Sequence, residues 1–215
     1  MRAILPYFLD SNVLIGYYFS ATDTWGYQAT KVFEDSEKNY TSSTVIHECF
    51  GIDTGGKCQT MKQSIVREFR RAIAQLTRDP SPDHLLANAE GWKIFPILKD
   101  IMSDPTIRQG DVRATIRNAM DEYDRRCEER LQIIQNPIHL SVHRRTRDYP
   151  GIWQMLNPVL GDPDDTEVIL DAHDLAETVL PLYLYTGDAR HISSHRKKIV
   201  ELTKIAEIRY LGTVR

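Results

Sequence analysis

The sequence has no long hydrophobic run. None of its apolar stretches reaches the roughly 20 residues that a helix needs to cross a bilayer. Residues 1–8 carry one positive charge and lack both a long apolar segment and a cleavage site of small residues, so they do not have the features of a signal peptide. We therefore expect a cytoplasmic protein with no membrane partner.

Cysteine is also scarce. Cys49, Cys58 and Cys127 cannot all pair with one another, and none of them belongs to a C-x-x-C motif. These facts disfavour a disulfide framework and a four-thiolate zinc site. We expect buried thiols in a reducing compartment.

The chain has no excess of positive charge. Its 27 Lys and Arg residues are outnumbered by 30 Asp and Glu residues, which gives a net charge of −3. A passive nucleic-acid-binding module is usually basic, so this balance disfavours one. It remains compatible with a nuclease, because a pocket of acidic metal ligands lowers the total charge while a bound cation reverses the local field.

Strands and helices alternate in the two outer parts of the sequence. Apolar runs predict strands at 3–9, 182–186 and 208–211, and helical segments are predicted to start near Val13 and Asp164. Such alternation is typical of an α/β fold with a mainly parallel sheet.

The middle of the chain is predicted to be helical. Apolar residues recur at steps of three and four, most clearly between Val112 and Ile134, and the simplest explanation of this stripe is core packing. The second helical segment, from Pro82 toward Met102, is predicted to break at Pro96. Residues 136–163 are irregular and rich in proline and glycine.

Two aspartates directly follow predicted strands. Asp10 follows the run Phe8-Leu9, and Asp188 follows Tyr185-Thr186-Gly187. If these strands are parallel neighbours, the two carboxylates meet at one edge of the sheet, where they repel each other unless a cation lies between them. Mg²⁺ and Mn²⁺ prefer such oxygen ligands.

Two further acids are candidates for the same place. Glu48 lies on an otherwise apolar helix face, where an acid is costly to bury without a partner. Asp165 lies in line with the apolar stripe of its helix and in the first turn, where the helix dipole favours a carboxylate. We select Asp165 and keep Asp171 and Asp164 as alternatives. The solvated face of this helix is predicted to hold Asp164, Glu167, Asp171, Asp174 and Thr178.

Four segments resemble the motifs of PIN domains, in the family's order. Residues 9–15 look like the opening motif (strand, Asp, hydroxyl residue, Asn, apolar helix), and residues 43–48 resemble the second, in which Glu follows a turn led by Ser or Thr. Residues 165–172 resemble the third, although a start at Asp171 gives a spacing closer to the family's. Residues 185–188 are similar to the fourth, a strand that ends Thr-x-Asp.

The resemblance implies a fold and an activity. The fold is a three-layer α/β/α domain with a central, mainly parallel sheet, here a single domain over 1–215 with a helical insertion at roughly 59–160. The activity is hydrolysis of phosphodiester bonds in single-stranded or structured RNA, with one or two Mg²⁺ or Mn²⁺ ions. The implied metal ligands and catalytic residues are Asp10, Glu48, Asp165 and Asp188, with Asn12 and Thr186 orienting them.

Basic residues near these motifs are candidates for contact with the RNA backbone. Arg144 and Arg145 lie before the third motif, where Tyr149 and Trp153 could stack on bases, and Arg190 follows the fourth. Most charge clusters are only solvated surface. The arginines of the long helix 111–134 are mixed with acids and are interpreted as solvent surface.

Several other chemistries are weaker interpretations. His47-Glu48 lacks the second histidine of a zincin helix, and His191 and His195 lack a third zinc ligand, so the latter two are interpreted as surface residues. Asn12 stands where a haloacid-dehalogenase phosphatase needs a second acid. The main alternative is a PIN fold that binds RNA or protein without cutting. Many small PIN proteins are toxins, so an antitoxin and a homodimer partner are further hypotheses.

Overall fold

A central sheet of five parallel strands organises the chain, in the order β3-β2-β1-β4-β5. The computed structural model describes residues 5–36, 38–51 and 56–214. The α/β class with a parallel sheet is thereby confirmed. The strands are β1 (Tyr7–Leu9), β2 (Asn39–Ser42), β3 (Leu140–His143), β4 (Tyr183–Thr186) and β5 (Glu207–Tyr210).

The order of the strands reverses at β1. From β1 the chain adds β2 and then β3 on one side, and it adds β4 and β5 on the other side. Leu9 is paired with Tyr185, so Asp10 and Thr186 leave β1 and β4 at the same level. In open α/β sheets ligands bind beyond the carboxyl ends of the strands at such a switch point.

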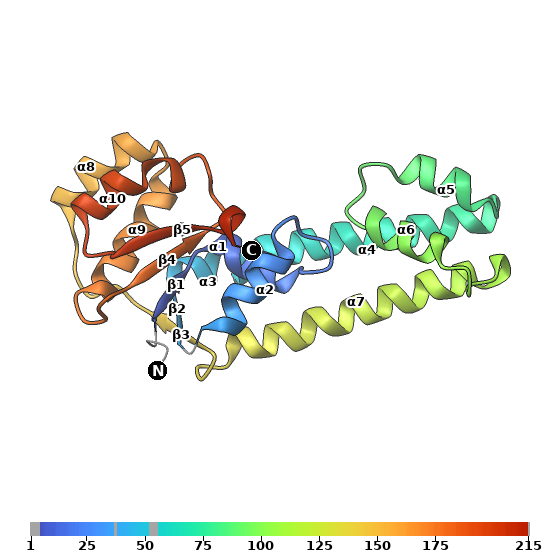
Figure 1. Cartoon of the computed structure of the whole chain (residues 1–215), viewed down its shortest axis with the longest axis horizontal. Coiled ribbons are helices and arrows are strands. Elements are labelled where there is room, and N and C mark those ends of the chain that lie inside the picture. Colours follow the sequence, from blue (N-terminus) through green and yellow to red (C-terminus); the bar gives the residue numbers. More distant parts are fainter. Residues whose placement is uncertain (1–4, 37, 52–55, 215) are drawn as a thin grey trace.

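Helices flank the sheet (Figure 1). In Figure 1, α8, α9 and α10 lie together on one side of the strands, and α1 and α2 lie on the other. The helices of the core are α1 (Ser11–Tyr18), α2 (Gly26–Asp35), α3 (Ser43–Phe50), α8 (Pro150–Leu160), α9 (Pro163–Ala176) and α10 (Arg196–Leu202). Three short 3₁₀ turns are η1 (Gln109–Asp111), η2 (Ser193–His195) and η3 (Leu211–Thr213).

A helical arm, residues 56–135, projects from this core. Its two long helices lie side by side and carry the two short ones at the far end (Figure 1). The long pair packs through buried side chains such as Phe69 and Tyr123, whose ring centroids are 5.8 Å apart. The helices of the arm are α4 (Gly56–Arg78), α5 (Pro82–Ala89), α6 (Phe95–Ser103) and α7 (Val112–Gln135).

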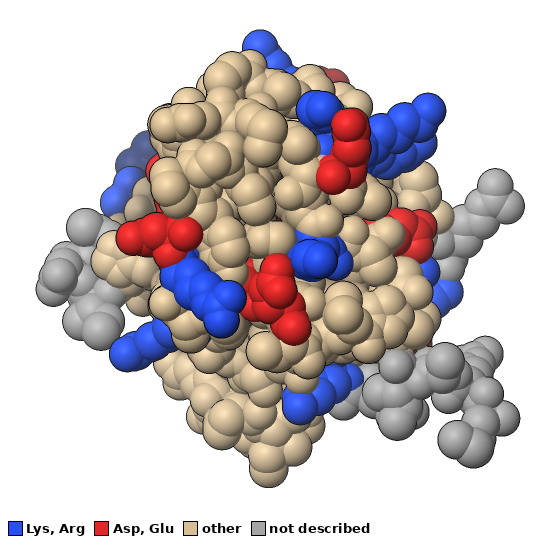
Figure 2. Space-filling view, turned by 90° about the vertical axis from the view of Figure 1, so that its left-hand side faces the viewer, with Lys and Arg blue, Asp and Glu red and all other residues tan. Residues whose placement is uncertain are grey.

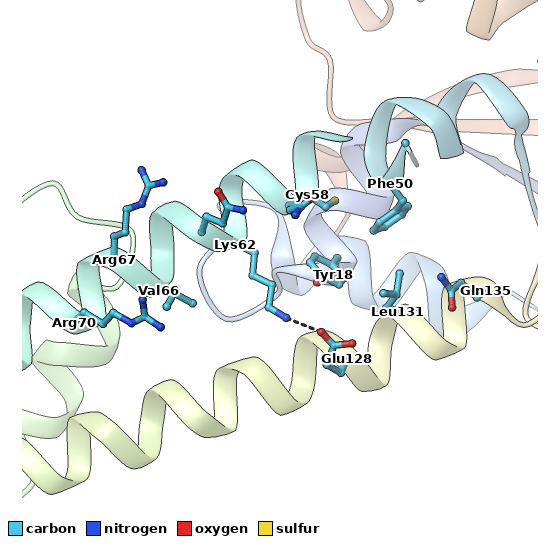
Figure 3. A pocket seen from close by; sticks show the side chains of 13 residues that line it. Tyr18, Phe50, Cys58, Lys62, Val66, Arg67, Arg70, Glu128, Leu131 and Gln135 are labelled. Carbon is cyan, nitrogen blue, oxygen red and sulfur yellow. Dashed lines mark hydrogen bonds and ion pairs between the residues drawn. The ribbon is translucent and has the colours of Figure 1, made fainter. Parts of the chain in front are cut away.

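A groove of about 770 Å³ lies between α4 and α7 near the base of the arm. Figure 3 shows Lys62 reaching across it from α4 to Glu128 on α7, with Nζ and Oε1 2.6 Å apart. Lys62 also pairs with Asp124 at 2.7 Å. These pairs join the two helices where they leave the core.

Two predicted boundaries differ from the structure. The predicted insertion of 59–160 extends too far, because residues 140–143 form strand β3 of the sheet and α8 packs on α9 in the core. The break in the second helical segment falls before Phe95 rather than at Pro96. Pro96 lies in the first turn of α6, where its missing N–H costs no helical hydrogen bond.

Strand β2 was not predicted as a strand, because it is mostly polar. Its polar side chains are buried. Thr41 Oγ1 donates to the Leu9 carbonyl at 2.9 Å and Asn39 Nδ2 donates to the Phe33 carbonyl at 2.8 Å, whereas Asn39 Oδ1 has no hydrogen-bond partner among the described residues. Both acceptors come from neighbouring elements, so the usual apolar signal of a buried strand is absent.

Two predictions based on what the sequence lacks can be compared with the structure. The three cysteines are unpaired and buried, as expected. Among the described residues, no helix is both long enough and apolar enough to cross a membrane.

Candidate functional site

Asp10 occupies the point where β1 turns into α1. Its carboxylate caps the helix by accepting the Ser11 N–H at 2.6 Å, and its other oxygen accepts from Asn12 Nδ2 at 3.2 Å and from Thr186 Oγ1 at 2.7 Å. The side chain is almost fully buried. Burial raises the pKa of Asp10 against the effect of these donors, and the charge of Glu48 raises it further.

The Thr186 hydroxyl connects Asp10 to Asp188. It donates to Asp10 and accepts the Asp188 backbone N–H at 2.9 Å, which fixes the turn after β4. Gly187 lies between them, and a Cβ at this position would stand 2.9 Å from the Cβ of Asn12. Only glycine therefore lets β4 approach the first turn of α1 this closely.

Asp165 enters the same crevice from the first turn of α9. Burial raises its pKa to about 7, and the carboxylates of Asp10, Asp162 and Asp188 raise it as well. Its Oδ2 atom is buried and receives no hydrogen bond of suitable geometry from the described residues. An acid in this state has lost water without gaining a well-aligned hydrogen bond, and the nearby charge of His191 offsets only part of that cost.

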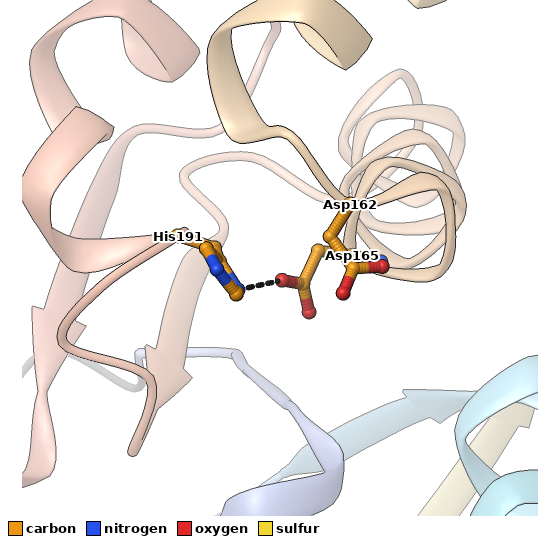
Figure 4. A group of neighbouring side chains, drawn as sticks. All are labelled: Asp162, Asp165 and His191. Carbon is orange, nitrogen blue, oxygen red and sulfur yellow. Dashed lines mark hydrogen bonds and ion pairs between the residues drawn. The ribbon is translucent and has the colours of Figure 1, made fainter.

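His191 completes this corner of the site (Figure 4). Its Nδ1 lies 3.1 Å from Asp165 Oδ2 and 3.4 Å from Asp188 Oδ2, and its backbone N–H donates to Asp188 Oδ1 at 2.6 Å. One ligand atom each from Asp162, Asp165 and His191 lie within 4.8 Å of one another. His191 was predicted to be a surface residue; its side chain is partly exposed, but it lies against two acids of the crevice.

A signal for His191 was present in the sequence. It lies three residues after Asp188, in the loop that follows a strand at the switch point. Asp162 was not selected as a candidate from the sequence. It caps α9, and its carboxylate accepts hydrogen bonds from the backbone N–H groups of Asp164 and Asp165. Capping uses one oxygen, and the other remains available to a ligand.

Glu48 is the acid that α3 contributes near Asp10. It lies on α3, which begins where Ser42 accepts the Val45 N–H, and its charge acts on Asp10. Lys57, in the first turn of α4, forms an ion pair with Glu48. That hydrogen bond raises the pKa of Lys57, and the charge of Asp10 contributes to the rise. The base of the arm therefore meets the acidic crevice here.

The four selected acids come from separate segments of the chain. Glu48 acts electrostatically on Asp10, and Asp10 and Asp188 act on Asp165. The alternatives do not share this position: Asp164 is exposed, and Asp171 is buried with its Oδ1 3.6 Å from Arg145 Nε. The geometry therefore favours Asp165 over both alternatives as the acid that faces Asp10 and Asp188.

The predicted solvated face of α9 is partly wrong. Asp171 and Asp174 are 4% and 5% exposed. Loop 143–149 and α8 cover that side of the helix, and Asp174 accepts from Tyr149 Oη at 2.7 Å and from the Thr146 N–H at 2.9 Å. Burial opposes its charged form, yet these donors and His143 outweigh burial and lower the Asp174 pKa to about 2.

The predicted substrate contacts fall in different environments. Arg144 and Arg190 are exposed. Arg145 instead pairs with Glu167 and approaches Asp171, so it fastens loop 143–149 to α9. Tyr149 is half-buried and holds Asp174, and Trp153 packs against the core rather than presenting a free ring.

The residues of the crevice fit a divalent cation. Asp10, Asp165 and Asp188 bring carboxylate charge together, and Asp165 has an unsatisfied buried oxygen and a pKa raised to about 7. A cation among them would replace repulsion with attraction, and carboxylate-rich sets suit Mg²⁺ and Mn²⁺. Comparisons with family models, with curated proteins and with solved structures found no match for this chain.

Proposed function

We propose that this protein is a metal-dependent nuclease of the PIN type that hydrolyses phosphodiester bonds in RNA. The observation that supports the proposal is the electrostatic influence of Asp10 and Asp188 on Asp165, and of Glu48 on Asp10, beyond the carboxyl ends of β1 and β4. Burying acids together is costly, and a cation site is the arrangement that offsets this cost.

The chain's own residues have defined tasks in this proposal. Asp10, Asp165, Asp188 and His191 would hold the cation, with Asp162 and Glu48 at the rim. When bound, Mg²⁺ or Mn²⁺ supplies an activated water and stabilises charge on the phosphate. Asn12 and Thr186 hold the Asp10 carboxylate in one orientation through hydrogen bonds of 3.2 Å and 2.7 Å.

Lys57 has a separate task. Its ion pair with Glu48 neutralises the acid at the rim, so part of the crevice is charge-balanced before a cation arrives. RNA is preferred over DNA because of the resemblance of the four motifs to PIN domains, and single strands suit a narrow acidic crevice because one backbone can enter it.

The test is a cleavage assay on labelled single-stranded RNA with Mn²⁺ or Mg²⁺, beside EDTA and a DNA strand of the same sequence. We expect cleavage of RNA that requires the metal and is lost in Asp188→Asn. Asp164→Asn is the matched control, since it removes an exposed acid next to Asp165. Equal activity in both variants would contradict the assigned site. Metal-independent RNA binding with no cleavage would support a binding module instead.

A further inference from the structure

Helix α4 is charged very differently from the rest of the arm. It contains six basic residues and one acid, whereas α7 contains five basic residues and five acids. The single acid of α4, Glu68, is half-buried, and its carboxylate accepts the Ile94 backbone N–H at 3.2 Å. A strongly positive helix in a chain of net charge −3 needs an explanation.

The positive side chains of α4 are ordered by helix geometry. The apolar side chains Cys58, Ile65, Phe69, Ala72 and Leu76 form its buried stripe. The opposite side holds a row of exposed residues at steps of three, four and seven, which places them on one face. We call the polar residues of this row the basic face; its members are Lys57, Thr60, Ser64, Arg67, Arg71 and Arg78, and the exposed Ala74 lies between the last two.

Every member of the basic face is a hydrogen-bond donor, and none is acidic. In the described part of the chain, Arg67 and Arg78 form no ion pair. Figure 3 shows the Arg67 side chain extending from α4 on the side away from α7. Arg71 lies over the Trp92 ring, with its guanidinium carbon 4.8 Å from the ring centroid.

The basic face begins at the acidic crevice. Lys57, its first member, pairs with Glu48, and both residues line a recess of about 520 Å³ together with Thr60. From there the row runs along the arm for about 30 Å, since an α-helix rises about 1.5 Å per residue. A strand whose phosphate lies in the crevice can therefore continue along α4.

The neighbouring surfaces lack this separation of charge. On α7, Arg125 and Arg126 are both occupied by Glu122. At the end of the core opposite the arm, Lys and Arg side chains are interspersed with Asp and Glu (Figure 2). Solvation alone explains mixed charge of this kind, but it does not explain a row of one sign that starts at the candidate active site.

We propose that the basic face of α4 binds the phosphate backbone of single-stranded RNA and leads it into the acidic crevice. This inference rests on the proposed nuclease function for its substrate. The contact is electrostatic and independent of base sequence, as expected for a row of Arg side chains without a groove that reads base edges.

The experiment measures binding separately from cleavage. A fluorescein-labelled single-stranded RNA of about 20 nucleotides, longer than a typical single site, is titrated in EDTA at several salt concentrations. The variant is Arg67→Gln/Arg78→Gln, which leaves Lys57 and the Arg71–Trp92 contact in place. The control is Lys99→Gln/Arg113→Gln, which removes two exposed charges from the same arm but from α6 and α7.

We expect the variant to bind the RNA about tenfold more weakly than the parent. The plot of the logarithm of its binding constant against the logarithm of the salt concentration should have a slope smaller by about 1.4, because each of the two lost phosphate contacts accounts for about 0.7. The control should bind as the parent does. With Mn²⁺, the variant should lose kcat/KM on the long RNA and keep it on a dinucleotide, which is too short to span the about 15 Å of α4 between Lys57 and Arg67.

Two failures are distinguishable. If the parent cleaves RNA and the variant binds and cleaves the long RNA equally well, the basic face is not a substrate path, although the nuclease stands. If the parent shows no metal-dependent cleavage, but the variant binds RNA more weakly than the parent and the control does not, the basic face stands as an RNA-binding surface and the nuclease proposal fails. If the control lost as much RNA affinity as the variant, the loss would reflect the net charge of the arm rather than the basic face, and the inference would be overturned.

Discussion

The two ends of helix α9 shift the pKa of a buried carboxyl group in opposite directions. At the start of the helix, Asp165 faces other acids, its Oδ2 lacks a hydrogen bond from the described residues, and its pKa is raised to about 7. Near the other end, Asp174 is held by Tyr149, Thr146 and His143, and its pKa is lowered to about 2.

The difference separates a structural acid from a candidate functional one. Asp174 stabilises the fold, because its charge is fully satisfied where it lies. Asp165 opposes folding in the absence of a ligand, because its charge is desolvated and repelled. A residue that is costly to the fold at a strand switch point is a candidate for function.

Activity should give the largest contrast between these two acids. Asp165→Asn is expected to lower kcat/KM for Mn²⁺-dependent RNA cleavage by about 10³-fold or more, since a metal ligand contributes several kcal/mol to the transition state. Asp174→Asn should keep most of the activity of the folded fraction. Initial rates at saturating Mn²⁺ measure both, and comparable losses would remove the distinction.

Stability should show the reverse order. Asp174→Asn is expected to lower the free energy of unfolding by about 2–3 kcal/mol, because it removes a buried charged acceptor from several donors. Chemical denaturation at pH 7 measures this loss. Thr178→Ala provides a control on an exposed position of the same segment and should change stability little. An Asp174→Asn protein as stable as the parent would show that loop 143–149 is held by other contacts.

The pH dependence of stability sharpens the comparison further. The Asp165 pKa is about 7 in the folded chain against an ordinary value of 3.8, so the folded state keeps a proton that the unfolded state releases. In EDTA, stability should therefore rise as pH falls from 8 to 5, by on the order of 2 kcal/mol.

Asp174 does not contribute to this change between pH 8 and 5. Its pKa is lowered, so the stability that its charge provides is lost only as pH falls below about 4 toward 2. Thermal unfolding across pH 5–8 measures the trend. Asp165→Asn should weaken it and leave the share of Asp10, whose pKa burial also raises. An unchanged trend in Asp165→Asn would show that Asp165 does not contribute. Saturating Mn²⁺ should weaken the dependence, because the cation replaces the proton.

The smallest effect concerns His191. Its Nδ1 lies 3.1 Å from Asp165 and 3.4 Å from Asp188, so it either binds the cation or orients those acids. His191→Ala is expected to weaken Mn²⁺ affinity about tenfold. Isothermal titration with Mn²⁺ measures this, beside His195→Ala, which removes a histidine one helical turn away. Unchanged affinity in both variants would leave His191 outside the metal set.

Much of the fold could be predicted because the signals were local. The run Phe8-Leu9-Asp10 predicts a strand followed by a capped helix, and the structure has both. The stripe from Val112 to Ile134 predicts one long helix, which is α7. The polar strand β2 could not be recognised, because its buried Asn39 and Thr41 donate hydrogen bonds to acceptors on other elements.

The sequence by itself determined the short-range features: where the apolar strands β1 and β4 and the helix α1 begin, which acids follow strands, and that Asp165 lies on the apolar side of its helix. Only the tertiary structure decided which of these features meet. It placed β4 beside β1, so that one Thr186 hydroxyl joins Asp10 and Asp188 across 176 positions of sequence. It also buried Asp174, drew His191 into the crevice and set the basic face of α4 against its rim. The physical reason is range: caps and helical stripes depend on neighbours a few residues away, whereas burial and charge repulsion depend on which distant segments the sheet brings together.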